Sequence, residues 1–241
     1  MKKALVVGGS NGIGLAIALC LSKEYSVTII DKVSPSYDNL DNINYEQFDL
    51  TNDDYSIFDK YHDISVLMIT AGFGNLALFK DIEESLISTY FKVNTIPVIR
   101  LIKRFYNHLE SQEEFFCGVM VSISGFMSSP FFSVYGATKA ALKIFIESVN
   151  VELKKAGSLN QILNISPGFI RGTHFGNGIT NDLKETMPLA QDIIKHLMQK
   201  DDLFIPLYDE IYAEVLQRYH KDFRAEGIHS YDYKKNCGRV K

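Results

Sequence analysis

Tryptophan is absent from this chain of 241 residues, and cysteine and proline occur only 3 and 6 times. Cys20, Cys117 and Cys237 are an odd number without the spacing of a metal site, so we expect neither a disulfide framework nor a bound metal. Cys20 and Cys117 lie in or beside apolar runs and are interpreted as small core residues, whereas Cys237 lies in a polar stretch and is expected to be exposed. This usage fits a reduced, cytoplasmic protein.

A strongly basic composition and a long apolar run are also missing. With 25 Lys and Arg against 29 Asp and Glu, the formal net charge is −4, so the chain lacks the excess of positive charge that is typical of nucleic-acid-binding proteins. The apolar run after Lys2 and Lys3 stops at Gly8, short of the roughly 7–15 apolar residues of a signal peptide. No stretch approaches the ~20 apolar residues of a membrane span. We therefore expect a small-molecule substrate, with neither nucleic acid nor membrane as a partner.

Neither an internal repeat nor a linker rich in Pro, Gly or Ser divides the chain. At this length, its 46% hydrophobic composition suffices for one large core. Strand-like runs alternate with helical runs, which predicts a parallel sheet with helices on both faces. The expected fold is a three-layer α/β domain, a doubly wound parallel sheet of Rossmann type, as a single domain over residues 1–241.

The first thirty residues predict a strand, a glycine-rich turn, a helix and a second strand. Glycines allow a tight turn and a close approach of the backbone to a phosphate, whose charge the N–H groups at the helix start then stabilise. A tight turn without a ligand is the plain alternative. We predict that this loop binds a dinucleotide through Gly8, Ser10, Asn11, Gly12, Ile13 and Gly14.

The second predicted strand, 25–30, ends at Asp31, seventeen residues after Gly14. An acidic side chain there accepts hydrogen bonds from both ribose hydroxyls of an adenosine and repels a 2′-phosphate. NAD(H) is therefore the favoured cofactor. NADP(H) is not excluded, because the neighbouring Lys32 can receive a phosphate.

Tyr135 and Lys139 lie four residues apart, one turn along the same face of a predicted helix. An ammonium beside a phenol favours the phenolate and lowers the tyrosine pKa from about 10. Tyr135 can then exchange a proton with a carbonyl or alcohol oxygen, and Ser122, thirteen residues earlier at a strand end, can hold that oxygen. A surface tyrosine and lysine on an ordinary helix are the alternative.

The order and spacing of these motifs resemble the short-chain dehydrogenase/reductase family, from residue 4 to about residue 173. Its glycine motif matches Gly8, Gly12 and Gly14, and its serine strand matches residues 119–125. The resemblance implies that Lys139 binds the nicotinamide ribose, and that an asparagine twenty-eight residues before Ser122 kinks its helix and holds a water. The implied catalytic residues are Asn94, Ser122, Tyr135 and Lys139.

The same resemblance implies further cofactor contacts. Asp49 and Leu50 match the turn that contacts adenine, in which the Asp49 carboxylate accepts a hydrogen bond from the adenine amino group. Residues 166–170 resemble the segment that lies along the nicotinamide. The implied contacts, besides those of the glycine loop, are Asp31, Asp49, Leu50, Ala71, Gly72, Tyr135, Lys139, Pro167, Gly168 and Ile170.

Several positions depart from the family pattern. Val7 stands where threonine is usual and Thr70 where asparagine is usual; both positions tie central strands together, and the Thr70 hydroxyl can keep part of that role. Gly172 stands where a threonine is expected, with Thr173 one residue late. The segment 171–178 matches a mobile lid, in which an arginine either binds an anionic substrate group or is simply solvated.

The C-terminal segment, about 200–241, is divergent and lacks the family's Asp-Gly-Gly signature. Residues 203–205 predict an edge strand closed by Pro206, and a helix is expected at about 208–219. The polar tail 228–241 either folds over the site or is disordered.

The helical stretches 86–109 and 133–155 are apolar on more than their core face, as buried or interface helices are. In the family the matching helices form a four-helix contact, so a homodimer or homotetramer is expected. Phe131 and Phe132, just before the tyrosine, suggest an apolar substrate wall, although core filling explains them equally well.

The expected activity is reversible hydride transfer between a nicotinamide cofactor and a carbonyl or secondary alcohol of a small substrate, with Tyr135 as general acid/base. A dinucleotide-binding sensor or scaffold of the same fold, without chemistry, is the alternative. A sugar-nucleotide epimerase or dehydratase of the extended branch is a third, but the chain length and the Gly8-x3-Gly12 spacing argue against it. Sugars, polyols, small ketones and hydroxy acids all remain open as substrates.

Overall fold

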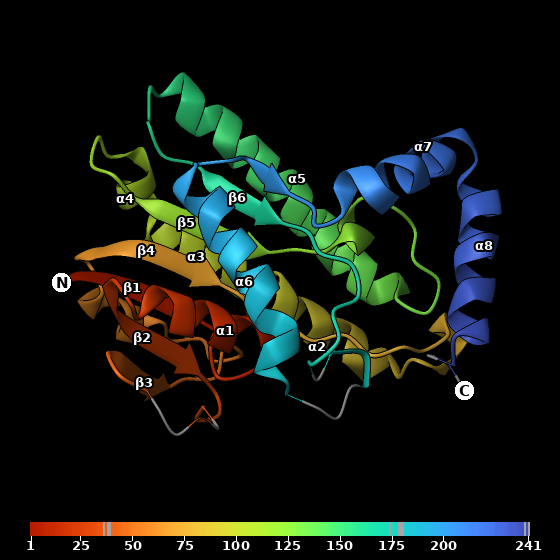
Figure 1. Cartoon of the computed structure of the whole chain (residues 1–241), viewed down its shortest axis with the longest axis horizontal. Coiled ribbons are helices and arrows are strands. Elements are labelled where there is room, and N and C mark those ends of the chain that lie inside the picture. Colours follow the sequence, from red (N-terminus) through yellow and green to blue (C-terminus); the bar gives the residue numbers. More distant parts are fainter. Residues whose placement is uncertain (36, 38–39, 174, 178–180, 239, 241) are drawn as a thin grey trace.

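The computed structural model describes residues 1–35, 37, 40–173, 175–177, 181–238 and 240 (Figure 1). In these residues one parallel sheet runs in the order β3-β2-β1-β4-β5-β6-β7. The strands are β1 (Lys2–Val7), β2 (Tyr25–Asp31), β3 (Ile43–Gln47), β4 (Ile64–Ile69), β5 (Phe116–Met120), β6 (Ile162–Ile165) and β7 (Leu203–Phe204). The strand order changes direction between β1 and β4, and ligands of such sheets bind beyond the carboxyl ends of the strands at this point.

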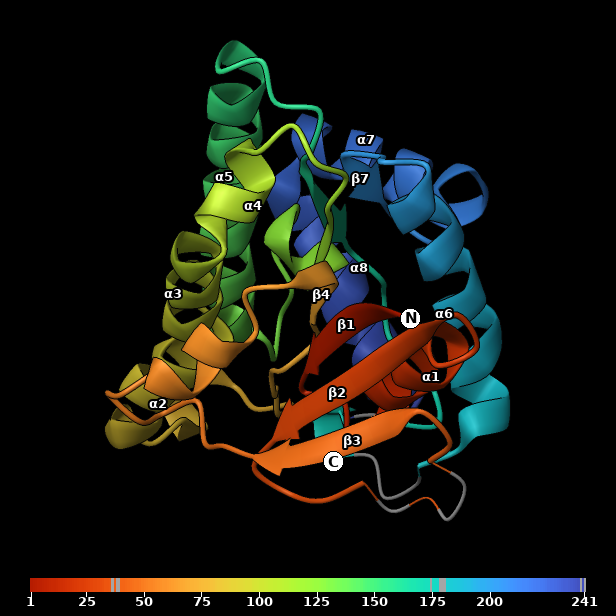
Figure 2. The same ribbon diagram turned by 90° about the vertical axis from the view of Figure 1, so that its left-hand side faces the viewer.

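Helices cover both faces of the sheet (Figure 2). Successive side chains of a strand point to opposite faces, so Leu5 and Val7 of β1 join one buried cluster while Ala4 and Val6 join the other. The first face carries α2 (Glu84–Asn94), α3 (Ile96–Arg104), α4 (Tyr106–Glu110) and α5 (Ser133–Lys155), and the second carries α1 (Gly12–Leu21) and α6 (Leu183–Met198). The predicted three-layer, doubly wound fold is confirmed.

The long apolar stretch expected at 86–109 is divided into three helices. The first break falls at Thr95, directly after Asn94, where φ is −120° and ψ is −59°. Pro97 lies in the first turn of α3, where its missing N–H leaves no helical hydrogen bond unmade. The helix predicted at 133–155 has those same bounds in α5.

The cysteines lie as expected: Cys117 is buried, Cys20 is half-buried against the core, and Cys237 is exposed. Among the residues that the structure describes, no helix combines the length and the apolar character that crossing a bilayer requires.

The divergent C-terminal segment folds. β7 is the predicted edge strand, and a π-helical turn (Tyr208–Tyr212) leads into α7 (Ala213–Lys221). The tail forms α8 (Phe223–Asn236), which Asp222 caps by accepting hydrogen bonds from the N–H groups of Arg224 and Ala225, each at 3.0 Å. Of the two alternatives for the tail, the folded one therefore holds as far as residue 236; positions 239 and 241 lie outside the described residues.

Candidate active site

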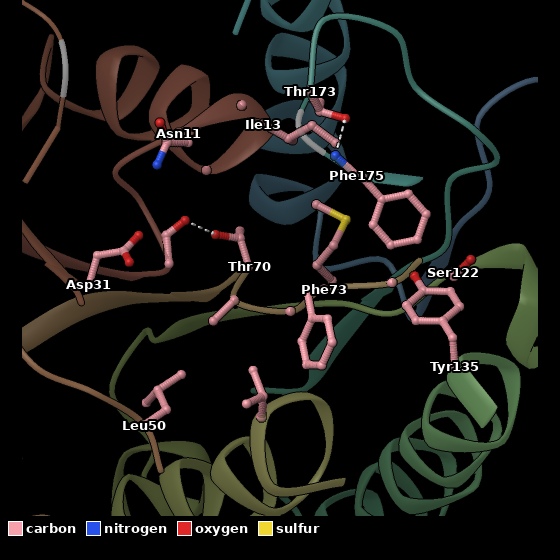
Figure 3. A pocket seen from close by; sticks show the side chains of 18 of the residues that line it. Asn11, Ile13, Asp31, Leu50, Thr70, Phe73, Ser122, Tyr135, Thr173 and Phe175 are labelled. Atoms are coloured by element: carbon pink, nitrogen blue, oxygen red, sulfur yellow. Dashed lines mark hydrogen bonds between the residues drawn. The ribbon is translucent and has the colours of Figure 1, made fainter. Parts of the chain in front are cut away.

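A cleft of about 760 Å³ opens at the carboxyl ends of β1 and β4 (Figure 3). Its lining comes from the residues at and after the ends of β1, β2, β3, β4, β5 and β6, from α2, and from the first two turns of α5. The predicted residues that line it are Gly8, Asn11, Gly12, Ile13, Gly14, Asp31, Asp49, Leu50, Ala71, Gly72, Ser122, Tyr135, Lys139, Pro167, Gly168 and Ile170.

Two predicted residues, Ser10 and Asn94, do not line the cleft and are fully buried beside it. The Ser10 hydroxyl donates to the Val33 carbonyl at 2.5 Å, which turns that side chain away from the cleft.

The glycine loop forms a cradle that side chains would fill. Gly8 has φ of +87°, and a Cβ there would lie 2.4 Å from the Ala71 nitrogen. A Cβ on Gly14 would lie 2.2 Å from the Gly8 carbonyl oxygen. Because Asn11 makes no side-chain hydrogen bond as the N-cap, the backbone N–H groups at the start of α1 remain available for a ligand on the cleft side.

One of these N–H groups has a partner that the sequence did not reveal. The Gly12 N–H donates to Oδ1 of Asn181 at 2.8 Å, and Nδ2 of Asn181 lies 3.5 Å from Oδ1 of Asn11. Asn181 lies two residues before α6, next to its N-cap Asp182, and is 169 residues from Gly12. Only the packing of α6 against α1 brings them together.

Asp31 lies at the edge of the glycine loop. One carboxylate oxygen accepts from the Ser10 N–H at 3.1 Å and the other from the Lys32 N–H at 2.7 Å. Asp49, further along the same side, accepts from the Thr51 N–H at 2.9 Å and from its hydroxyl at 2.8 Å. These two hydrogen bonds hold the pKa of Asp49 below its usual value.

Thr70 joins the ends of the two central strands. Its hydroxyl donates to the carbonyl of Gly8 at 2.9 Å and lies 3.2 Å from that of Val7. The expectation that the hydroxyl at this position keeps the strand-joining role is confirmed.

Ser122 and Tyr135 lie together at the opposite end of the cleft from Asp31 (Figure 3). Both are 7% exposed, and the Ser122 hydroxyl lies close enough to the Tyr135 phenol to influence its pKa. Burial raises the pKa of the Tyr135 phenol, because a phenolate loses its hydration there, and the Ser122 hydroxyl only partly offsets this rise.

Lys139 differs from the expectation. Its Nζ donates to the Met120 carbonyl at 2.8 Å and lies 5.7 Å from the centre of the Tyr135 ring. Burial lowers the pKa of the Lys139 ammonium to about 7. The expected lowering of the Tyr135 pKa by this cation is therefore not what dominates, because burial removes water from both groups.

Asn94, the last residue of α2, connects the loop after β4 with α5. Its side-chain oxygen accepts from the Phe73 N–H, and its nitrogen donates to the Phe73 carbonyl, both at 2.9 Å; the nitrogen also reaches the Thr138 hydroxyl at 3.3 Å. A Cβ on Gly72 would lie 3.3 Å from Oδ1 of Asn94 and 3.4 Å from Nζ of Lys139, so these two polar groups flank Gly72. The four predicted catalytic residues thus share one region of the molecule.

Aromatic rings that the sequence interpretation missed surround Tyr135. Phe175 stacks on Phe132, with ring centres 5.5 Å apart, and tilts over Tyr135 at 5.0 Å. A Cβ on Gly74 would lie 2.7 Å from the Phe175 ring and 2.9 Å from that of Tyr135, so glycine is required beneath the two rings. Phe73 lies below them in the cleft (Figure 3). Phe73 lies in a loop and Phe175 begins a three-residue 3-10 turn, segments in which no periodicity marks a residue as part of a site.

Thr173, one residue later than the family pattern, still reaches the glycine loop. A Cβ on Gly12 would lie 3.3 Å from its methyl group, and its hydroxyl donates to the Ile170 carbonyl at 3.2 Å. Arg171, the arginine of the predicted lid, is exposed. Positions 174 and 178 of that lid lie outside the described residues.

The structure thus combines a parallel sheet, a glycine-loop cleft at its switch point, Ser122, Tyr135 and Lys139 lining that cleft, and Asn94 buried beside it, which is the arrangement that the sequence resemblance implied. A family model described as short chain dehydrogenase matches residues 2–184. The chain belongs to the short-chain dehydrogenase family.

Individual relatives are distant. The uncharacterized oxidoreductase YvaG of Bacillus subtilis is 29% identical over 151 residues, which is 57% of this chain and 57% of that protein's length. A short-chain dehydrogenase of Streptomyces avermitilis has a similar structure, with a TM-score of 0.77 and 21% identity over 98% of this chain and 100% of that one. A family member from Burkholderia phymatum, solved in complex with NAD, has a TM-score of 0.75 and 14% identity over 93% and 95% of the two chains.

Proposed function

We propose that this protein catalyses reversible hydride transfer between NAD(H) and the carbonyl or secondary-alcohol carbon of a small substrate. One observation carries the proposal: the hydroxyls of Ser122 and Tyr135 lie at one end of a single cleft, and the glycine loop and Asp31 lie at the other (Figure 3). A bound nicotinamide supplies the hydride acceptor or donor.

The residues present fit a dinucleotide. The cradle at Gly8 and Gly14 has no room for a Cβ, and the N–H groups at the start of α1 suit a pyrophosphate. Asp31 would accept the ribose hydroxyls, and Asp49 the adenine amino group. The residues that would flank the nicotinamide half all line the cleft: Ala71, Gly72, Pro167, Gly168 and Ile170.

The preference for NAD(H) follows from Asp31. Its carboxylate is anchored by the Ser10 and Lys32 N–H groups at the edge of the cleft, where a 2′-phosphate would meet a negative charge. Lys32 also lines the cleft and would reduce this discrimination.

In the reducing direction, Tyr135 donates its proton to the carbonyl oxygen, and Ser122 holds that oxygen in place. The raised pKa of Tyr135 keeps the phenol protonated at neutral pH, as a proton donor requires. Lys139, whose pKa lies at about 7, both takes up and releases protons in that range and would return a proton to Tyr135. Asn94 holds the loop after β4 against α5, so that Gly72 and Lys139 stay in place.

The protein would act as a homodimer or homotetramer. Four branched apolar side chains on the outer faces of α3 and α5 are exposed, by 46%, 36%, 59% and 63%: Ile96, Ile99, Ile144 and Val151. Helix faces of this kind typically form contacts between copies. Measurement of the mass in solution at micromolar protein tests this, and a monomer would contradict it.

Binding and turnover test the function separately. The melting temperature is measured with NAD(H) and with NADP(H), because a ligand that binds only the folded state raises it. Nicotinamide absorbance is then followed with a panel of neutral ketones, hydroxy acids and sugars. A cofactor-induced shift without turnover of any carbonyl or alcohol would favour a dinucleotide-binding sensor of the same fold.

A further inference from the structure

The C-terminal helices lie outside the stretch that matches the family model, yet they contact the substrate end of the site (Figure 1). One face of α8 follows the loop that leads into α5. Tyr231 stacks on Phe131 with ring centres 4.6 Å apart, and a Cβ on Gly227 would lie 3.6 Å from the Ser128 hydroxyl. On α8, Tyr231 and Lys234 lie four and seven residues after Gly227, so all three are on one face of the helix.

Lys234 makes the most specific of these contacts. It is only 8% exposed, and its Nζ donates to the Ser129 hydroxyl at 2.7 Å and to the Pro130 carbonyl at 2.9 Å. The same nitrogen lies 5.6 Å from the centre of the Phe132 ring. An ammonium loses hydration when it is buried, so hydrogen bonds with good geometry must replace the lost water.

The two C-terminal helices are themselves joined, so α8 is held in position. Nε of Arg218 in α7 donates to Glu226 of α8 at 2.7 Å, and Glu226 is 8% exposed. Tyr212 ends the π-helical turn that leads into α7. A Cβ on Gly168 would lie 1.7 Å from the Tyr212 hydroxyl, so this turn packs against the loop after β6.

The contacted loop, residues 128–132, is called the strap below. Phe131 has φ of +69°, a conformation that a phenylalanine adopts only when its surroundings hold it. Its carbonyl accepts from the Ala77 N–H at 3.0 Å. The next residue, Phe132, packs 5.4 Å from the Tyr135 ring and 5.5 Å from the Phe175 ring. The strap thus links Lys234 to the ring of Tyr135.

We infer that α8 is a substrate-side clamp and that Lys234 is a positioning residue, which holds the strap so that Phe132 supports Tyr135 and Phe175. The effect on catalysis rests on the proposed function of Tyr135, whereas the effect on the strap does not. The hydrogen bonds of Asp31 and Asp49 at the proposed adenosine end run to Ser10, Lys32 and Thr51, so we expect cofactor binding to be independent of α8.

The test compares Lys234→Met with Lys221→Met, a control at an exposed position of α7. Hydrogen exchange of the backbone in residues 126–135 is expected to accelerate at least roughly tenfold in Lys234→Met, because the hydrogen bonds to both Ser129 and Pro130 are lost and a single charge-assisted hydrogen bond already accounts for about that factor. Exchange in residues 2–31 stays unchanged, and Lys221→Met behaves as wild type. For whichever carbonyl of the panel turns over, KM rises while the Kd of NADH stays the same, and Lys234→Arg recovers part of the loss.

The outcomes separate the two claims. Unchanged exchange in the strap of Lys234→Met overturns the clamp, and so does faster exchange spread over the whole chain, which would indicate a general structural role. If Lys234→Met does not fold, Ser129→Ala removes the Ser129 hydroxyl and leaves the hydrogen bond to the Pro130 carbonyl, and a smaller acceleration confined to the strap is expected. Wild-type protein that binds NADH but reduces no carbonyl refutes the proposed function, while the exchange result still decides the clamp.

Discussion

The two ends of the cleft differ in how far apart along the chain their residues lie. At the glycine-loop end, Asp31 accepts from the Ser10 N–H across 21 residues, within one strand–helix–strand unit. At the aromatic end, Lys234 reaches Ser129 across 105 residues and from outside the sheet. The first end follows from the strand order, and the second depends on how loops and the C-terminal helices pack. This difference suggests that cofactor binding and substrate handling can be disrupted separately.

The largest expected effect is a loss of turnover caused by a change at the aromatic end of the cleft alone. Tyr135→Phe deletes the proton donor, so kcat should fall by roughly 10²–10⁴-fold, while the Kd of NADH changes little because the ring and its packing remain. Steady-state kinetics and cofactor titration measure the two quantities. Tyr106→Phe, at a distant tyrosine, is the control, and near-wild-type turnover of Tyr135→Phe would remove Tyr135 from its proposed role.

The next largest effect is on cofactor affinity and comes from a change at the glycine-loop end of the cleft. Asp31→Ala removes the charge that opposes a 2′-phosphate, so the Kd of NADH should rise by roughly tenfold, about the loss of one charged hydrogen bond, and the Kd of NADPH should fall. The kcat at saturating cofactor stays near that of wild type. Titrations of both cofactors against Asp31→Ala and the exposed control Asp53→Asn check this, and an unchanged preference would contradict the assignment of Asp31.

A pH experiment tests the burial of Lys139. Its folded-state pKa of about 7 lies below the unfolded value near 10.5, so the unfolded chain binds more protons between these pH values. The free energy of unfolding should therefore rise with pH from about 7 upward, by at most about 1.4 kcal/mol per pH unit. Denaturant unfolding of wild type and Lys139→Met at pH 7 and 9 measures this contribution. Equal pH slopes for the two proteins would show that Lys139 is not buried as described.

The smallest expected effect concerns Asn181, a distant residue that reaches the glycine loop. Its side-chain oxygen occupies the Gly12 N–H, a group that a phosphate would also use. Asn181→Ala should therefore tighten NADH binding by roughly fivefold, since one neutral hydrogen bond no longer competes. Calorimetric titration measures the change, and weaker binding would instead mean that Asn181 itself contacts the cofactor.

Much of the fold and of the candidate site could be predicted because it depends on short-range patterns. Alternating apolar runs indicated the layered sheet, and the glycines at positions 8 and 14 marked a turn that has no room for a Cβ. The spacing of Tyr135 and Lys139 placed both on one face of α5. Asp31 and Ser122 were each predicted at the end of a strand, and the carboxyl ends of parallel strands meet at one edge of the sheet, which is where the structure has both.

The remaining features depend on packing between distant segments, which leaves no local pattern. Phe175 over Tyr135, Asn181 against Gly12 and Lys234 on the strap each join loops or helices that are remote in sequence. Burial of the phenol likewise decides the pKa of Tyr135, so the tuning expected from a neighbouring cation did not dominate.

The layered parallel sheet, the tight glycine-rich turn and the placing of Tyr135 and Lys139 on one helix face were therefore determined by the sequence alone, because hydrophobic periodicity and backbone sterics act over a few residues. The tertiary structure decided the surroundings of the phenol, the course of the strap and the place of α8. These depend on desolvation and on contacts between surfaces that meet only after the chain has folded.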